Sequence, residues 1–181
     1  MKQVFDNLVS LYPMPLVLLG TKYEDRINWM IAGHVGIIDM QHIMVSLSKR
    51  HYTNDLLKKS KKVSVSLVKP EMLKNADYTG CVSGWNFDKA SVFKYEAGDY
   101  EVPIPQDATI TMECNLEDIY TSGDFECFIL NVIKTYADTS CIVHNKLSLS
   151  RVKPVLFEMP GYNYINCGEI ISNCNFNSKG E

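Results

Sequence analysis

Residues 43–54 read Ile-Met-Val-Ser-Leu-Ser-Lys-Arg-His-Tyr-Thr-Asn, and this stretch predicts a strand that runs into a basic, hydroxyl-bearing turn. Strand side chains alternate with a period of two, so one face of the strand carries polar residues and the other is apolar. The first face has Met44, Ser46 and Ser48, and the second has Ile43, Val45 and Leu47. Leu56 to Lys59 then have helical character, so the turn is expected to start a helix.

The turn itself carries Lys49, Arg50, His51 and Thr53. Cationic and hydroxyl side chains at a helix start form an anion site, because free backbone N–H groups and the positive end of the helix dipole converge there. A phosphate group is the expected ligand of such a site. A second interpretation stays open from these residues alone: Thr53 caps the helix, and Lys49 and Arg50 are the solvated end of a strand.

Length and composition indicate a globular protein. A chain of 181 residues can bury roughly 70% of its unfolded surface, so a single domain over residues 1–181 is expected. Hydrophobic residues make up 46% and charged residues 22%, which is unlike a disordered chain. The formal net charge of -3 argues against nucleic-acid binding, since that depends on many Lys and Arg contacts to phosphates. Any anion site must therefore be local.

The apolar run at residues 16–19 is too short to span a bilayer or to act as a secretory segment, so we expect a cytoplasmic protein with no membrane partner. The cysteines are scattered without a Cys-x-x-Cys pair, which excludes a zinc ribbon and a thioredoxin-type motif. We expect no metal site and mostly reduced, partly buried thiols. The six are Cys81, Cys114, Cys127, Cys141, Cys167 and Cys174.

The rest of the chain reads mostly as strands. A turn over residues 23–26 and the glycines Gly33 and Gly36 interrupt its first part, and glycines in a strand mark a bend or the close approach of backbone or ligand. No strand-helix alternation of the doubly wound kind occurs, so we expect a small closed β-barrel with peripheral helices. Strands are expected over residues 15–21, 27–39, 43–48, 62–68, 108–116, 125–135, 152–157 and 162–165, helices over 53–60 and 70–73, an irregular connection over 77–93, and a flexible tail over 173–181.

An ordered set of stretches carries a family resemblance: residues 15–21, 28–33, 46–54, 82–89, 123–124, 152–156 and 168–171, with Tyr162. In this order the sequence resembles the flavin reductase-like family, whose members bind FMN in a split β-barrel and include the flavoredoxins. The resemblance implies a mainly β fold, a Greek-key split barrel with short peripheral helices. It also implies bound FMN and a homodimer, because barrels of this family complete the cofactor site across a subunit interface.

The resemblance further implies roles for particular residues. The phosphate of FMN would lie on the strand-to-helix turn, where each charge-assisted hydrogen bond contributes about 1.5 to 3 kcal/mol. The implied phosphate ligands are Lys49, Arg50 and Thr53, with Ser46, Ser48 and His51 nearby. The implied ring-edge segment is Asn28, Trp29, Met30, Ile31 and Ala32, in which Ile31 replaces a threonine that is common in the family. The chain also has Gln41-His42 where the family commonly has a Pro-Pro pair.

Two further side chains have open interpretations. Lys89 lies near the phosphate or the subunit interface, or else it is a surface lysine paired with Asp88. His34 is a candidate for lining the ring or substrate pocket, whereas a structural role is favoured for His42 and His144.

No Gly-x-Gly-x-x-Gly follows a strand, so a separate dinucleotide-binding domain is absent from the sequence pattern. NADH or NADPH would then stack directly over the flavin of an FMN oxidoreductase. Two alternatives remain. The protein is an electron carrier that exchanges electrons with a redox partner protein, or a non-enzymatic barrel that holds a phosphorylated ligand.

Overall fold

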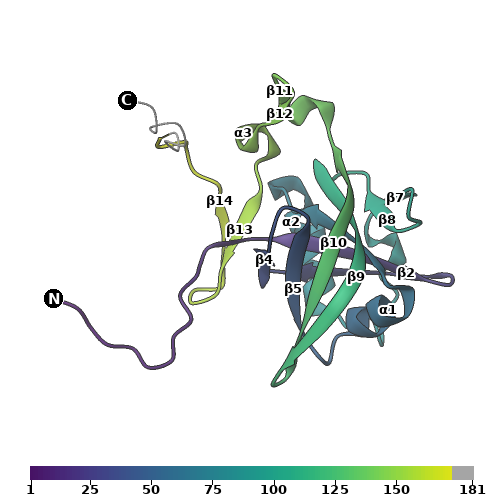
Figure 1. Ribbon diagram of the computed structural model, residues 1–181, viewed down its shortest axis with the longest axis horizontal. Helices are drawn as coiled ribbons and strands as arrows, with labels where there is room; N and C mark the ends of the chain where they lie inside the picture. The colour runs from purple at the N-terminus through teal and green to yellow at the C-terminus, as the bar shows by residue number, and fades with distance from the viewer. Residues whose placement is uncertain (173–181) are drawn as a thin grey trace.

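A computed structural model describes residues 1–172 (Figure 1). Its main element is a curled, fully antiparallel sheet of seven strands. In spatial order the strands are β3 (Arg26–Ala32), β2 (Val17–Tyr23), β6 (Lys62–Leu67), β9 (Ile110–Ser122), β10 (Phe125–Ala137), β5 (His42–Ser48) and β4 (Val35–Ile37). The mainly β fold class is confirmed. The sheet ends at β3 and β4, so the barrel is split, and the expectation of full closure was wrong.

Smaller elements surround this sheet. Three short sheets are β1 (Met14–Pro15) with β13 (Val155–Glu158) and β14 (Asn163–Asn166), β7 (Tyr95–Ala97) with β8 (Pro103–Pro105), and β11 (Ile142–Val143) with β12 (Lys146–Leu147). The helices are α1 (Tyr52–Ser60), α2 (Leu73–Cys81) and α3 (Leu149–Val152), with 3₁₀ turns η1 (Pro70–Met72), η2 (Ala90–Val92) and η3 (Thr139–Cys141). None of the helices within residues 1–172 has the length and hydropathy that a membrane crossing requires.

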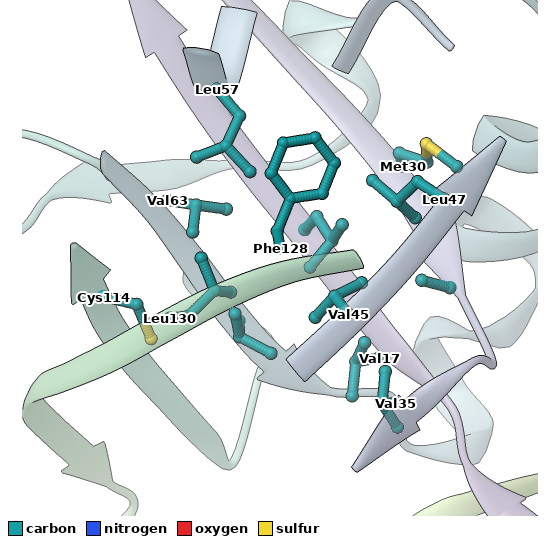
Figure 2. Packing of buried hydrophobic residues seen from close by; sticks show 13 residues of the cluster. Val17, Met30, Val35, Val45, Leu47, Leu57, Val63, Cys114, Phe128 and Leu130 are labelled. Carbon is teal, nitrogen blue, oxygen red and sulfur yellow. The ribbon is translucent and has the colours of Figure 1, made fainter. Parts of the chain in front are cut away.

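The main core lies inside the curled sheet and under α1. Figure 2 shows the ring of Phe128, fully buried on β10, among Leu57 of α1 and Val63 of β6. Val45 and Leu47 of β5 point into this core, whereas Ser46 and Ser48 are half-buried on the other face. The alternation predicted for residues 43–48 is therefore confirmed.

A second core lies on the opposite face of β2 and β3. Trp29 and Leu18 are fully buried there, together with Met72 and Ala76 from η1 and α2. The neighbouring residues Val17, Leu19 and Met30 belong to the main core instead. Strands β2 and β3 are thus buried on both faces, which explains their continuous apolar runs.

Several sequence-based boundaries were wrong. The expected strand over residues 27–39 is interrupted after Ala32, because β4 begins only at Val35 and pairs with β5. Residues 77–93 are not wholly irregular: α2 continues to Cys81 and packs Ala76 and Thr79 inward. Residues 152–154 end α3 and lead into β13. The expected tail over 173–181 lies outside the described residues.

Candidate functional site

The turn after β5 is held by its own backbone. The His51 amide donates to the carbonyl of Ser48 at 3.1 Å, and the Asn54 amide donates to the carbonyl of His51 at 3.1 Å. The Lys49 amide donates to Asp124 O at 2.9 Å, which fastens the turn to the loop before β10. Helix α1 starts at Tyr52 with His51 as its N-cap residue and no side-chain cap. The interpretation of Thr53 as a helix cap was therefore wrong.

Thr53 instead bonds to β3. The Asn28 side-chain amide donates to the Thr53 hydroxyl at 2.8 Å, and both residues are buried. Asn28 Oδ1 has no hydrogen-bond partner among the described residues. It faces Gly84, where an added Cβ would lie 2.4 Å from it, so the loop after α2 approaches this pair closely.

A pocket of about 450 Å³ opens beside this turn, and we call it the polar pocket. Its charged side chains are Arg50 and Lys89, beside His51, and no carboxylate is among its lining residues. Several other lining residues carry hydroxyl groups. These residues are Ser48, Tyr52, Thr53, Thr79 and Ser83.

Within residues 1–172, neither Arg50 nor Lys89 of the polar pocket forms an ion pair with a carboxylate. Lys89 is buried, and its Nζ donates to Thr79 O at 2.6 Å and to Trp29 O at 3.3 Å. Burial lowers the pKa of Lys89. The pKa of His51 is also lowered, first by burial of the ring and then by the positive charges of Lys89 and Arg50. An anion in this pocket would relieve that repulsion, and a phosphate fits the donor set.

A second pocket of about 220 Å³ adjoins the first, and we call it the aromatic pocket. The two pockets share Met30, Ser48 and His51. Its walls are the ends of β3 and β5 and three rings, Phe125, Phe157 and Tyr164. An added Cβ on Gly33 would lie 2.8 Å from Cδ1 of Phe157, so the glycine lets this ring approach the backbone just after β3. A flat, mostly apolar ligand with a charged tail matches the combined shape.

Most predicted site residues meet at these two pockets. Met30, Ile31, Ala32, Ser46, Ser48, His51 and His34 line the aromatic pocket, and Arg50, Thr53 and Lys89 line the polar pocket with Ser48 and His51. Three do not line either pocket: Asn28 lies behind Thr53, Trp29 is fully buried in the second core, and Lys49 acts electrostatically on Glu126.

The structure bears on the sequence-based interpretations of Lys89 and His42. Lys89 is not a surface lysine paired with Asp88, whose carboxylate accepts from the Ala90 amide. His42 is bonded to Asp39 and Glu117, each at 2.8 Å, which agrees with the structural role expected for it.

Other pocket residues were missed by sequence reasoning. Phe125, Phe157, Met159 and Tyr164 complete the aromatic pocket, and residues 79–84 complete the polar pocket. The pair of glycines Gly80 and Gly84 was the available signal for the second group. Nothing local marks the first group, because Phe125 at the start of β10 and the residues of β13, β14 and their turn reach the pocket only through the tertiary fold.

A family model described as a flavin reductase like domain matches residues 9–150. The chain belongs to this family. Membership of this family assigns the chain a flavin-related redox role. None of the curated proteins compared with the chain matches it.

Solved structures of flavoredoxins are similar to this flavin reductase-like chain along its whole length. The flavoredoxin of Methanosarcina acetivorans is 26% identical, with a TM-score of 0.92 and coverage of 99% of this chain and 98% of that chain. The flavoredoxin of Desulfovibrio vulgaris (Miyazaki F) is 29% identical, with a TM-score of 0.89 and coverage of 98% and 99%. An FMN-binding protein from Thermus thermophilus, 21% identical, shares the fold with a TM-score of 0.81 and coverage of 96% and 97%.

Proposed function

We propose that this protein binds FMN, with the phosphate in the polar pocket and the ring system in the aromatic pocket. The observation that carries the proposal is the adjacency of the two pockets through Met30, Ser48 and His51. One pocket has cations and hydroxyl groups without a carboxylate, and the other has apolar and aromatic walls. The name of the Thermus thermophilus protein, an FMN-binding protein of the same fold, supports FMN as the flavin.

The residues of the chain would bind and orient the flavin. Arg50, Lys89 and the Thr53 hydroxyl would bind the phosphate, and the backbone of β3 at Met30 to Ala32 would lie along the ring edge. Bound FMN would supply the electron-transfer chemistry, and we assign no lining side chain a role as acid, base or nucleophile in that step. Ile31 offers no hydroxyl to the ring edge, so contacts there depend on backbone groups.

In the proposed reaction the protein is an oxidoreductase that passes electrons from NADH or NADPH to an acceptor. The nicotinamide would stack over the exposed ring, because the sequence has no dinucleotide-binding motif. Anaerobic titration of FMN-loaded protein tests this by absorption. Bleaching of the flavin band by NADH or NADPH at catalytic rates supports the oxidoreductase, and bleaching by dithionite alone contradicts it.

A second candidate is an electron carrier that exchanges electrons with a redox partner protein. The full-length similarity to two flavoredoxins, at 26% and 29% identity, favours this alternative. If the protein is an electron carrier, a reduced partner protein bleaches the flavin absorption band, whereas NADH or NADPH leaves the band unchanged. If the purified protein gains no bound-flavin absorption when FMN is added, both flavin proposals are contradicted. The remaining hypothesis would then be a non-enzymatic barrel that holds a phosphorylated ligand.

We also retain a homodimer and a cytoplasmic location as parts of the proposal. At and after the edge strand β4, the apolar side chains of Ile37 and Met40 expose 85% and 99% of their surface. Exposed apolar surface of this kind often marks a protein–protein contact, which supports the dimer. The described cysteines are all free thiols, as expected in a reducing compartment. Sedimentation analysis of the purified protein tests the dimer.

A further inference from the structure

The N-terminal arm, residues 1–13, precedes β1, and most of its apolar side chains are exposed. Figure 1 shows it running away from the seven-stranded sheet on the same side as the β13–β14 hairpin. Phe5, Val9 and Leu11 expose 65%, 70% and 82% of their surface, and Val4 and Leu8 are also exposed. Leaving this much apolar surface in water is unfavourable. The arm therefore has the composition of a segment that packs against something.

A matching apolar cleft opens beside the base of the arm. It measures about 400 Å³ and lies between β4–β5 and β1–β2, and no charged side chain lines it. Its lining residues are Met14, Pro15, Val17, Val35, Gly36, Ile37, Ile43, Met44, Val45, Val65, Leu67 and Met112. One wall is β4, the last strand in the order of the main sheet, and edge strands with exposed apolar residues readily pair with another chain.

We propose that residues 1–11 of each chain pack into the apolar cleft of a second copy of this chain, so that two copies exchange arms. The arm leaves its own cleft at Met14 and Pro15 and runs outward, which carries its apolar residues away from that cleft. Thirteen extended residues reach about 45 Å, enough to cross to a neighbouring molecule. In a two-fold dimer the arm of each copy lies in the cleft of the other, so a single axis generates both contacts.

The exchange reaches the aromatic pocket through Tyr12 at the base of the arm. The Tyr12 hydroxyl lies 3.0 Å from Nε2 of His34 and donates to Sδ of Met159 at 3.2 Å. Both partners line the aromatic pocket. An arm held by the second copy would therefore keep Tyr12 against the pocket wall.

The arrangement is tested by cross-linking two different copies. One copy carries Leu8→Cys and the other Ile37→Cys, both with Cys81, Cys167 and Cys174 replaced by serine, and a short bismaleimide joins nearby thiols. Arm exchange predicts a covalent dimer in the mixture and little from either variant alone. A chain carrying both cysteines that cross-links only within itself would overturn the proposal, because its arm would then fill its own cleft.

A charge scan supplies the second test. The double variant Phe5→Asp, Val9→Asp should raise the dimer dissociation constant by at least about tenfold in sedimentation equilibrium, which corresponds to 1.4 kcal/mol. The matched control is Gln3→Asp, Asn7→Asp, which adds the same charge at polar arm positions and should leave dimerisation within about twofold. Equal dimerisation of the two variants overturns the exchange. FMN retention is measured separately, so a failure of the flavin proposal leaves this test unaffected.

Discussion

The side-chain amide of Asn28 donates a 2.8 Å hydrogen bond to the hydroxyl of Thr53. This bond joins β3, which borders the aromatic pocket, to the first turn of α1, which borders the polar pocket. Both residues are buried, so water cannot replace either partner cheaply. The relative position of the two pockets therefore depends on this pair.

Replacing Thr53 with valine should lower both stability and FMN affinity. The Asn28 amide would lose its acceptor, and a buried donor without a partner costs about 1 to 3 kcal/mol. Urea denaturation and fluorescence titration with FMN measure the two effects. Thr53→Ser keeps the hydroxyl and serves as the control, and a valine variant that binds FMN like the serine variant would disprove the role of this bond.

Arg50 should matter more for FMN than Lys49. Arg50 lines the polar pocket, whereas Lys49 acts on Glu126 from outside it. We expect Arg50→Ala to weaken FMN binding by about tenfold or more, the value of one charge-assisted contact, and Lys49→Ala to weaken it only a few-fold. Unchanged affinity in the double alanine variant would refute the phosphate assignment.

FMN affinity should rise as the pH falls through the pKa of His51. Burial, followed by the charges of Lys89 and Arg50, lowers this pKa in the free protein, so the ring is mostly neutral at pH 7. A bound phosphate would raise the pKa again, and binding then takes up a proton. Calorimetry in two buffers should detect that proton, and His51→Gln should lose it. Riboflavin, which lacks the phosphate, should show no uptake with either protein.

The stabilising contribution of Glu126 should be lost in acid. Burial alone would raise its pKa, but hydrogen bonds from Lys58 and Asn54 outweigh burial and lower it. A lowered pKa contributes stability above the unfolded value of about 4.3, and this contribution is lost as the pH falls through the folded value. Glu126→Gln should therefore flatten the stability profile below about pH 5, as followed by urea denaturation. A profile like that of the parent protein would contradict this.

Periodicity was sufficient for the elements that depend on local pattern. Residues 43–48 alternate strictly, and their apolar side chains enter the core as predicted. The strands predicted over residues 108–116 and 125–135 correspond to β9 and β10, which pair antiparallel, although β9 continues to Ser122. In the site, the charged turn at Arg50 and His51 was evident from the sequence.

Features that depend on distant contacts were not predictable. The helix over residues 73–81 buries only Ala76 and Thr79, so its pattern is too weak to distinguish from a loop. Lys89 follows Asp88 directly in the sequence, so a surface ion pair was an equally good interpretation. Its bonds to the carbonyls of Trp29 and Thr79 arise only from the tertiary fold. The rings of Phe157 and Tyr164 reach the aromatic pocket from a separate sheet.

Strand β3 is a shared wall between the two cores, with Trp29 in one and Met30 in the other. Any ligand that rests on its backbone is therefore positioned by packing on both sides of the strand. Substitutions deep in either core can shift that backbone by fractions of an ångström without touching the ligand. Core substitutions in residues that never contact the ligand can therefore change its position, and with it its binding properties.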